Sequence, residues 1–221
     1  YVRVGAANQK LDRERYEYLL QQKYNGYGFD HLIQPKATIS DIDAEALAEF
    51  LEIANSVRNI NENMLLPTDV ILQKLELLND KGITNAALLL FGKNPQQFFL
   101  NHYETKCGSF PGDEGYDKIL NDQEFRQNIL RNFYSSLSFL EESLKKMSQK
   151  HAVQRHEESE FPVAVIREIL VNMMVHRDYR QNIKNTVEIR PSFVSFYNPA
   201  QLFEPTINIE RLKTVHPSRP G

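Results

Sequence analysis

Residues 162–179 read PVAVIREILVNMMVHRDY, and this stretch decides the expected fold. Apolar residues fill most of its positions, and it contains no glycine and no proline after the first residue. The pattern predicts one helix that is buried on nearly all sides. Three polar side chains interrupt it at a spacing of four: Glu168, Asn172 and His176. At 100° per residue they fall within about 80° of arc, so they form a stripe on one face.

The polar stripe needs partners if the helix is buried, because a buried amide, carboxylate or imidazole costs free energy when it is left unpaired. In one interpretation the three side chains satisfy one another along the helix and face solvent. In a second they line a nucleotide-like or anion-binding pocket, where a carboxylate and an amide one turn apart hold Mg²⁺ and the carboxylate orients a water. Zinc is a third, although Asn is a poor zinc ligand and no second histidine lies one turn away.

The helix closes with Arg177, Asp178 and Tyr179. These residues allow two interpretations. In the first they cap the helix, with Arg177 near the negative helix end and Asp178 paired with Arg177 or with Arg180. In the second, Arg177 or Asp178 fixes the loop beside the pocket.

The same helix resembles a family of prokaryotic predicted transcriptional regulators of the Schlafen-AlbA or RecG-related type. The likeness lies in Pro162, in Arg167 followed by Glu168, in Asn172, and in the sequence HRDY at 176–179. Two further segments extend it over most of the chain. YVRVG at 1–5 resembles the last strand of the family's AlbA-like DNA-binding domain, and ITNAA at 83–87 with LFG at 90–92 resembles its middle segment.

The resemblance implies three parts: the remnant of an AlbA-like DNA-binding domain and a linker helix at 1–30, a connecting α/β region at 31–155, and a partial GHKL-like ATP-binding domain at 156–221. In that domain Glu168 would be the catalytic general base and Asn172 the Mg²⁺ ligand. The residues implied to bind ATP with Mg²⁺ are Glu168, Asn172, His176, Arg177 and Asp178.

The implied function is that of the central module of a DNA-binding transcriptional regulator with a nucleotide pocket. The alternatives are a Mg²⁺-dependent ATPase and a non-catalytic dimerisation scaffold. DNA would bind mostly through regions outside this chain, and we expect a homo-oligomer.

One departure from the family pattern concerns a loop. Family members commonly have Asn-Pro-Gly-Gly-Leu after the second strand that follows the helix, whereas this chain reads NPAQL at 198–202. Glycines allow a positive φ and a close approach of backbone to ligand, so their loss predicts a degenerate or non-hydrolytic pocket. The sequence also lacks a P-loop, because Ala87 stands where the first glycine would precede Gly92 and Lys93.

Elsewhere the pattern predicts a mixed α/β (α+β) fold of helices and strands. The resemblance implies that the last part of this fold is the N-terminal part of a GHKL-like α/β sandwich. The expected helices are 11–24, 43–55, 67–78, 121–150 and a short one at 207–213. The expected strands are 1–5, 83–91, 103–110, 185–190 and 193–198, with 83–91 paired to 103–110. A turn is expected at 25–28, a helix end at 81–82, a loop at 111–115 and a linker at 151–160.

The composition indicates the class of protein and the compartment in which we expect it. With 221 residues the chain can bury a core without disulfides, and Cys107 is its only cysteine. No stretch approaches the roughly 20 apolar residues that cross a bilayer, so we expect a cytoplasmic protein without membrane contact. The net charge of -3 gives no general attraction for nucleic acid. The strand-like start and the abrupt end suggest an internal piece of a longer protein.

Overall fold

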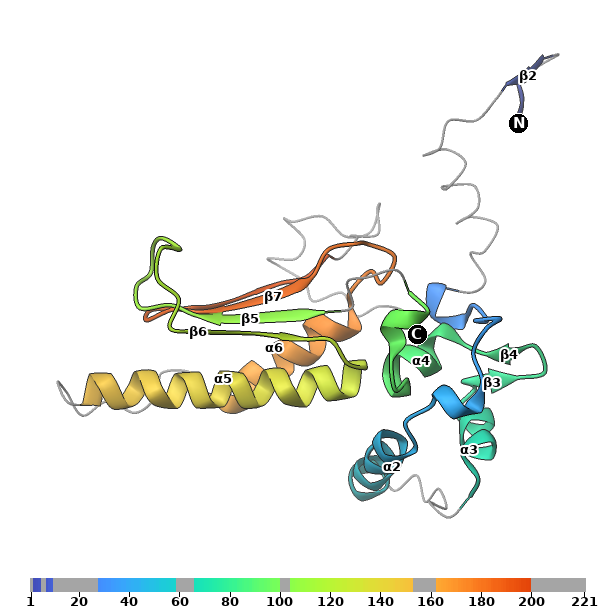
Figure 1. Ribbon diagram of the computed structural model, residues 1–221, viewed down its shortest axis with the longest axis horizontal. Helices are drawn as coiled ribbons and strands as arrows, with labels where there is room; N and C mark the ends of the chain where they lie inside the picture. Colours follow the sequence, from blue (N-terminus) through green and yellow to red (C-terminus); the bar gives the residue numbers. More distant parts are fainter. Residues whose placement is uncertain are drawn as a thin grey trace. The chain divides into compact units, whose positions relative to one another are not determined.

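The computed structural model describes residues 2–4, 7–9, 28–58, 66–99, 104–152 and 162–199, which form an α+β fold (Figure 1). The chain divides into two compact units, Tyr1–Leu89 and Leu90–Gly221. The helices predicted at 11–24 and 207–213, the turn before Gly28 and most of the linker at 151–160 lie outside the described residues. No helix within the described ranges combines the length and the apolar composition needed to cross a membrane.

The first unit begins with the strand expected at 1–5. β1 (Val2–Val4) pairs antiparallel with β2 (Ala7–Gln9). Two 3-10 turns, η1 (Phe29–His31) and η2 (Ile39–Asp41), come before the first described helix.

The helix expected at 43–55 is confirmed as α2 (Ala44–Arg58). Asp43 caps it, since its Oδ1 accepts hydrogen bonds from the backbone N–H groups of Glu45 and Ala46, both at 3.1 Å. Its apolar face buries Ala46, Leu47 and Leu51. The cap and the apolar period of 3.6 residues therefore both mark the beginning of this helix.

Helix α3 (Thr68–Lys74) begins where expected and ends earlier than expected. Its last turn is a Schellman motif: the N–H of Leu77 donates to the carbonyl of Leu72 at 2.8 Å, and that of Glu76 to the carbonyl of Gln73 at 3.0 Å. The motif requires a left-handed residue, and Glu76 takes that place with φ 59°. The chain then turns into a hairpin of β3 (Leu78–Asn79) and β4 (Gly82–Ile83), so the predicted helix end at 81–82 is a hairpin turn.

Glu76→Gly should raise the free energy of unfolding by about 0.5–1 kcal/mol, because glycine adopts this φ without the steric cost that a Cβ brings. Urea denaturation followed by circular dichroism measures the change. Glu52→Gly, at an exposed interior position of α2, is the matched control and should destabilise by about 1 kcal/mol. A loss of stability in both variants would show that the positive φ at Glu76 carries no strain.

The strand predicted at 83–91 is wrong. Residues Asn85–Phe91 form helix α4, and Thr84 caps it by accepting the N–H of Ala87 at 3.2 Å. Ala87, Leu88 and Leu89 are buried. A short apolar run satisfies a buried helix as well as a buried strand, and periodicity cannot separate the two. The expected pairing of 83–91 with 103–110 is therefore wrong as well.

The second unit is built on a four-stranded sheet of order β6-β5-β7-β8. Its strands are β5 (Thr105–Ser109), β6 (Asn121–Phe125), β7 (Asn185–Ile189) and β8 (Val194–Tyr197). β5 runs parallel to β7, and the other neighbours are antiparallel. The strands predicted at 103–110, 185–190 and 193–198 and the loop at 111–115 are confirmed.

The long helix predicted at 121–150 is correct only in its later part. Residues 121–125 form edge strand β6, and helix α5 spans Ile129–Ala152. Asn128 starts the helix, because its Oδ1 accepts the N–H of Arg131 at 2.9 Å while its Nδ2 donates to the carbonyl of Gly92 at 3.0 Å. Phe125 lies four residues before Ile129 and eight before Phe133, so the apolar helical period continues into the strand and hides this cap.

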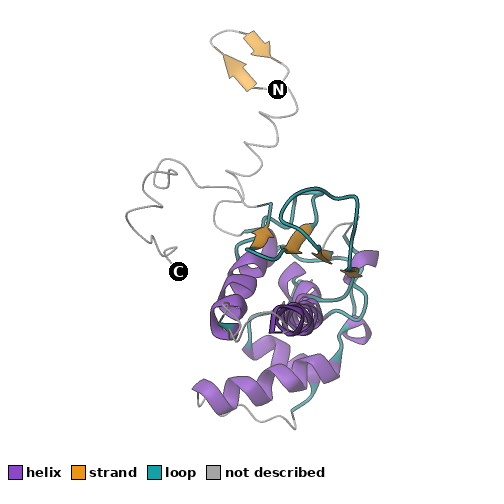
Figure 2. Ribbon diagram, turned by 90° about the vertical axis from the view of Figure 1, so that its left-hand side faces the viewer, coloured by secondary structure: helices purple, strands orange, loops and turns teal. Residues whose placement is uncertain are grey.

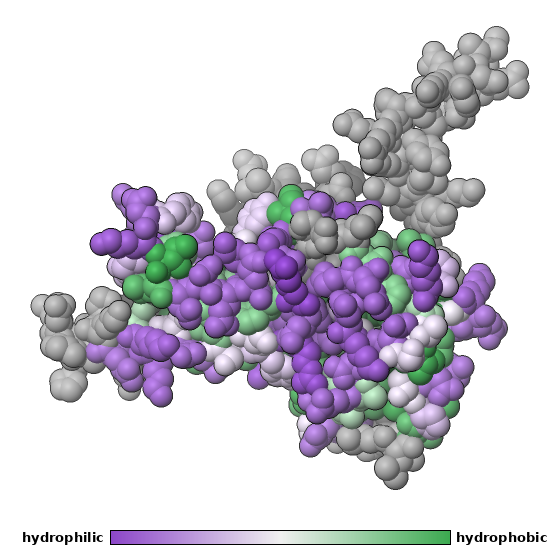
Figure 3. All heavy atoms as spheres, viewed as in Figure 1, coloured by the Kyte–Doolittle hydropathy of each residue, from purple (hydrophilic) through white to green (hydrophobic). Residues whose placement is uncertain are grey.

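Helices α5 and α6 (Val163–Val175) cover one face of the sheet, as Figures 1 and 2 both show. On the face shown in Figure 3, the C-terminal part of α5 presents hydrophilic residues outward. The core between helices and sheet consists of Cys107, Phe133, Phe139, Leu140, Leu144, Ile166, Leu170, Met173, Met174, Val187 and Ile189. This sheet combines strands from both sides of the boundary expected at 155/156, whereas the compact units divide within α4.

Cys107 lies in the middle of this core, where burial raises the pKa of its thiol to about 12. Near pH 8 the native protein should hold about a thousandfold less thiolate than a free cysteine would. Ellman's reagent should therefore react slowly with the native chain and promptly in denaturant. Fast labelling of the native chain would contradict this packing.

Candidate nucleotide-binding face of helix α6

Helix α6 buries one face and exposes the other. Ile166, Leu170, Met173 and Met174 are buried against α5 and the sheet. The opposite face leaves three aliphatic side chains between 40% and 61% exposed: Val165, Ile169 and Val175. The expected burial on nearly all sides is therefore wrong. Aliphatic residues stand on both faces, so the sequence offers no contrast from which the open face could be recognised.

The predicted polar stripe lies on the open face. Glu168, Asn172 and His176 are all exposed, and the Nδ2 of Asn172 donates to the Oε1 of Glu168 at 3.1 Å. This is the arrangement of the first interpretation, in which the stripe pairs along the helix. On the helical wheel, exposed Ile169 flanks the stripe on one side and exposed Val175 flanks it on the other.

The donor set of the stripe is compatible with Mg²⁺. The hydrogen bond between the two side chains uses the amide nitrogen of Asn172, so its Oδ1 takes no part in that bond and is of the hard oxygen type that Mg²⁺ prefers. No group of three or more His, Cys, Asp or Glu side chains that could hold a metal occurs among the described residues. Mg²⁺ usually takes only one or two protein ligands and completes its shell with water and phosphate, so the pair is sufficient in kind.

Arg177 ties the end of α6 to the start of β7. Its guanidinium is buried, with 5% of the residue exposed. Nη1 donates to the Oδ1 of Asn185 at 2.8 Å, and Nη2 donates to the carbonyl of Ile183. The ring of Tyr179 lies 5.4 Å from the guanidinium carbon. Arg177 therefore fixes the loop that follows the helix, and a ligand pocket beside that loop stays a prediction.

Asp178 and Tyr179 also hold the helix end. Asp178 pairs with Arg180 through Nε at 2.8 Å, which confirms the pairing expected in the first interpretation. Burial raises the pKa of Asp178, but hydrogen bonds from Arg180 outweigh it and hold that pKa below its usual value. The Tyr179 hydroxyl donates to the carbonyl of Met174 at 2.8 Å.

The chain leaving β8 passes over the same helix end. The Nδ2 of Asn198 donates to the carbonyl of Met173 at 2.8 Å, and the carbonyl of Pro199 accepts the N–H of Asp178 at 2.9 Å. Pro199, the last described residue, therefore contacts Asp178, which lies two positions after His176 in the sequence. The departure from the family pattern, Ala200 and Gln201, follows directly and lies outside the described residues.

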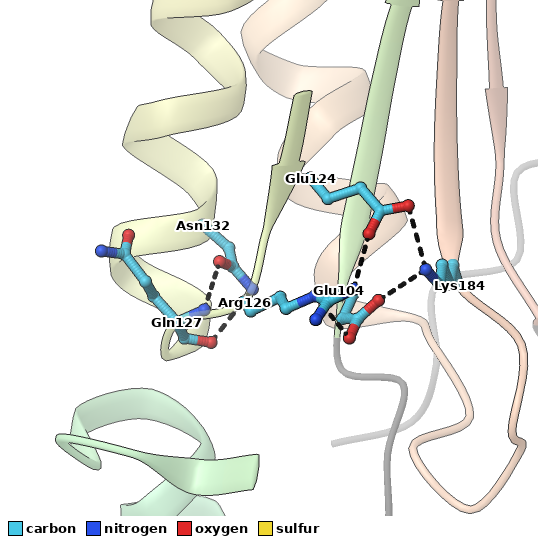
Figure 4. Close-up of polar contacts among 6 residues, drawn as sticks. All are labelled: Glu104, Glu124, Arg126, Gln127, Asn132 and Lys184. Atoms are coloured by element: carbon cyan, nitrogen blue, oxygen red, sulfur yellow. Dashed lines mark hydrogen bonds and ion pairs between the residues drawn. The ribbon is translucent and has the colours of Figure 1, made fainter. Parts of the chain in front are cut away.

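Sequence reasoning missed a cluster of four charged side chains at the start of β5 and β7 (Figure 4). Lys184 bridges the Oε2 of Glu104 at 2.7 Å and the Oε1 of Glu124 at 3.0 Å. Arg126 bridges the same two carboxylates at 2.9 and 2.8 Å. Hydrogen bonds from Lys184 and Arg126 lower the pKa of Glu124. The cluster joins edge strand β6 to the two central strands, and only the register of the sheet brings its members together.

Arg177→Lys should lower the free energy of unfolding by about 1–3 kcal/mol, because an ammonium cannot reproduce the forked contact with Asn185 and Ile183 and leaves a buried acceptor unpaired. Urea denaturation of the whole chain measures the loss. Arg180→Ala, which removes a more exposed ion pair with Asp178, is the matched control and should cost less than about 1 kcal/mol. Equal effects in the two variants would contradict the anchoring role of Arg177.

Comparisons with known proteins bear on the fold. Residues 18–105 match a domain of unknown function (DUF8451), which covers less than half of the chain. The structure is similar to the crystal structure of the DIP2311 protein from Corynebacterium diphtheriae, with a TM-score of 0.59 and 24% identity over 98% of this chain. The chain spans 41% of the length of that protein. At this identity the likeness shows a shared fold alone. The search among curated proteins gave no match.

Proposed function

We propose that this chain is the central module of a cytoplasmic DNA-binding transcriptional regulator and that the open face of α6 binds ATP with Mg²⁺. The observation that carries the proposal is the composition of that face. A carboxylate and an amide, hydrogen bonded one turn apart, lie between exposed aliphatic side chains. Apolar surface beside a few polar groups that fix orientation is a feature that this face shares with ligand sites.

Different residues of this face would bind different parts of the ligand. Asn172 Oδ1, with Glu168, would hold Mg²⁺, whose charge would offset that of the phosphates. The hydrogen bond from Asn172 keeps the Glu168 carboxylate in one orientation. The exposed side chains of Val165 and Ile169 offer apolar surface to a base or a ribose. Arg177 and Tyr179 are committed to holding the helix end, so they position the site without touching the nucleotide.

DNA binding belongs, in this proposal, to regions mostly outside the chain, and the regulator works as a homo-oligomer. The net charge of -3 agrees with a module that does not itself hold the phosphate backbone. The 41% share of the structurally similar protein that the chain spans leaves room for such regions in a protein of that size.

Isothermal titration of the full-length protein with ATP and Mg²⁺ tests the proposal. We expect saturable binding that Asn172→Ala weakens about tenfold or more, because the variant removes an oxygen ligand and frees the Glu168 carboxylate. Glu168→Ala should also weaken binding. The matched control is Glu141→Ala, an exposed helical carboxylate on α5, which should leave the affinity unchanged.

Phosphate release, measured in the same samples, separates a sensor from an ATPase. Binding without turnover supports a nucleotide sensor, and turnover that disappears in Glu168→Ala supports a general base at this position. Absence of ATP binding by the folded full-length protein would overturn the proposal.

A further inference from the structure

The second unit contains a hollow that the nucleotide proposal does not use. It has a volume of about 660 Å³ and lies where β5 ends, β6 begins and the C-terminal half of α5 passes beneath them. Its lining residues are Ser109, Leu120, Asn121, Ser143, Lys146, Met147 and Gln149. The volume is within the range of small-molecule sites, about 300–1,000 Å³.

Small side chains keep this space open. Along the side of α5 that faces the sheet, Phe139, Leu140 and Leu144 fill the core, whereas Ser143 stands at the hollow. Ser109, the last residue of β5, faces it from the sheet. Both serines are buried, with 6% and 4% exposed. The Ser109 hydroxyl donates a long hydrogen bond to the carbonyl of Asn121 at 3.4 Å. Protein interiors are packed to crystal-like density, so an opening beside two buried hydroxyls is suited to a guest that accepts hydrogen bonds.

One wall of the hollow is held in place before any ligand arrives. Leu120 belongs to the loop between β5 and β6, and Arg190 pins this loop by donating from Nη1 to the carbonyls of Gly112 at 3.0 Å and Gly115 at 3.1 Å. Figure 3 shows hydrophobic surface gathered over the loop, where Ile119 and Leu120 are exposed. A wall that is already ordered reduces the entropic cost of binding.

The lining also selects the charge of the guest. Lys146 is the one charged residue among the seven, and Leu120 and Met147 offer apolar contact. Lys146 pairs with Glu142 at 2.6 Å, but both side chains are 62% exposed. Such an exposed pair is weak, so an incoming anion can take the place of Glu142.

We propose that this hollow binds a small organic carboxylate. The aliphatic body lies against Leu120 and Met147, and the carboxylate meets Lys146 and accepts a hydrogen bond from a serine hydroxyl of the lining. The site is separate from the open face of α6, and its occupation does not depend on nucleotide.

Titration calorimetry with hexanoate, octanoate and the neutral analogue 1-hexanol tests the proposal on the whole protein. Octanoate should bind about tenfold more tightly than hexanoate, since each buried methylene adds to the affinity. Hexanoate should bind more tightly than 1-hexanol. Lys146→Met should weaken both carboxylates about three- to fivefold and leave 1-hexanol unchanged.

Two further variants complete the test. Lys145→Met removes a neighbouring exposed lysine that does not line the hollow, and it should leave all affinities unchanged. Ser143→Leu should fill the space and abolish binding, with circular dichroism showing a native helix content. Lys146→Met, at an exposed site, keeps the test decisive if Ser143→Leu fails to fold. Absence of saturable octanoate binding, no gain with chain length, or an equal loss in Lys145→Met would overturn the proposal.

Discussion

The buried guanidinium of Arg177 is the contact on which the second unit depends. It stands at the point where α6 ends and the chain turns toward β7, and it bonds to Asn185 and Ile183 at the entrance of that strand. The four-charge cluster holds the same entrance from the other side, through Lys184. Because both sets of contacts act on residues 183–185, they fix the position of β7 in the sheet and, through it, the orientation of α6.

This arrangement gives the HRDY sequence a role different from the one that the motif suggests on inspection. Arg177 and Tyr179 face inward and serve the fold, Asp178 pairs with Arg180, and only His176 continues the exposed stripe. Packing therefore accounts for Arg177 and Tyr179 of this sequence, although both lie next to the proposed site. The polar side chains available to a ligand are the ones that the fold leaves outside.

The sequence predicted the elements that have a strong local signal. α2 has an apolar period and a capping aspartate, and β7 and β8 alternate and are bounded by turn residues. The prediction was wrong where one pattern is compatible with two structures. α4 is a buried helix with the composition of a buried strand, and the residues of β6 were predicted as the start of the helix that follows them.

For the candidate site, the spacing of Glu168 and Asn172 predicted their alignment, which the structure bears out. Their exposure could not be predicted, because valine and isoleucine occupy both faces of α6. The charge cluster and the hollow depend on sheet register, and the sequence gives no means of deriving which residues on separate strands become neighbours.

The parallel pairing of β5 and β7 has a consequence for the order of events during synthesis. Thr105 pairs with Asn185, 80 positions later in the chain, and helices α5 and α6 lie between them. When β5 and β6 leave the ribosome, the central strand has only one of its two neighbours, and its other edge stays open until β7 is made. Such long-range closure is slow, so the nascent hairpin must wait with an unpaired edge, a state in which newly made chains are prone to associate with one another.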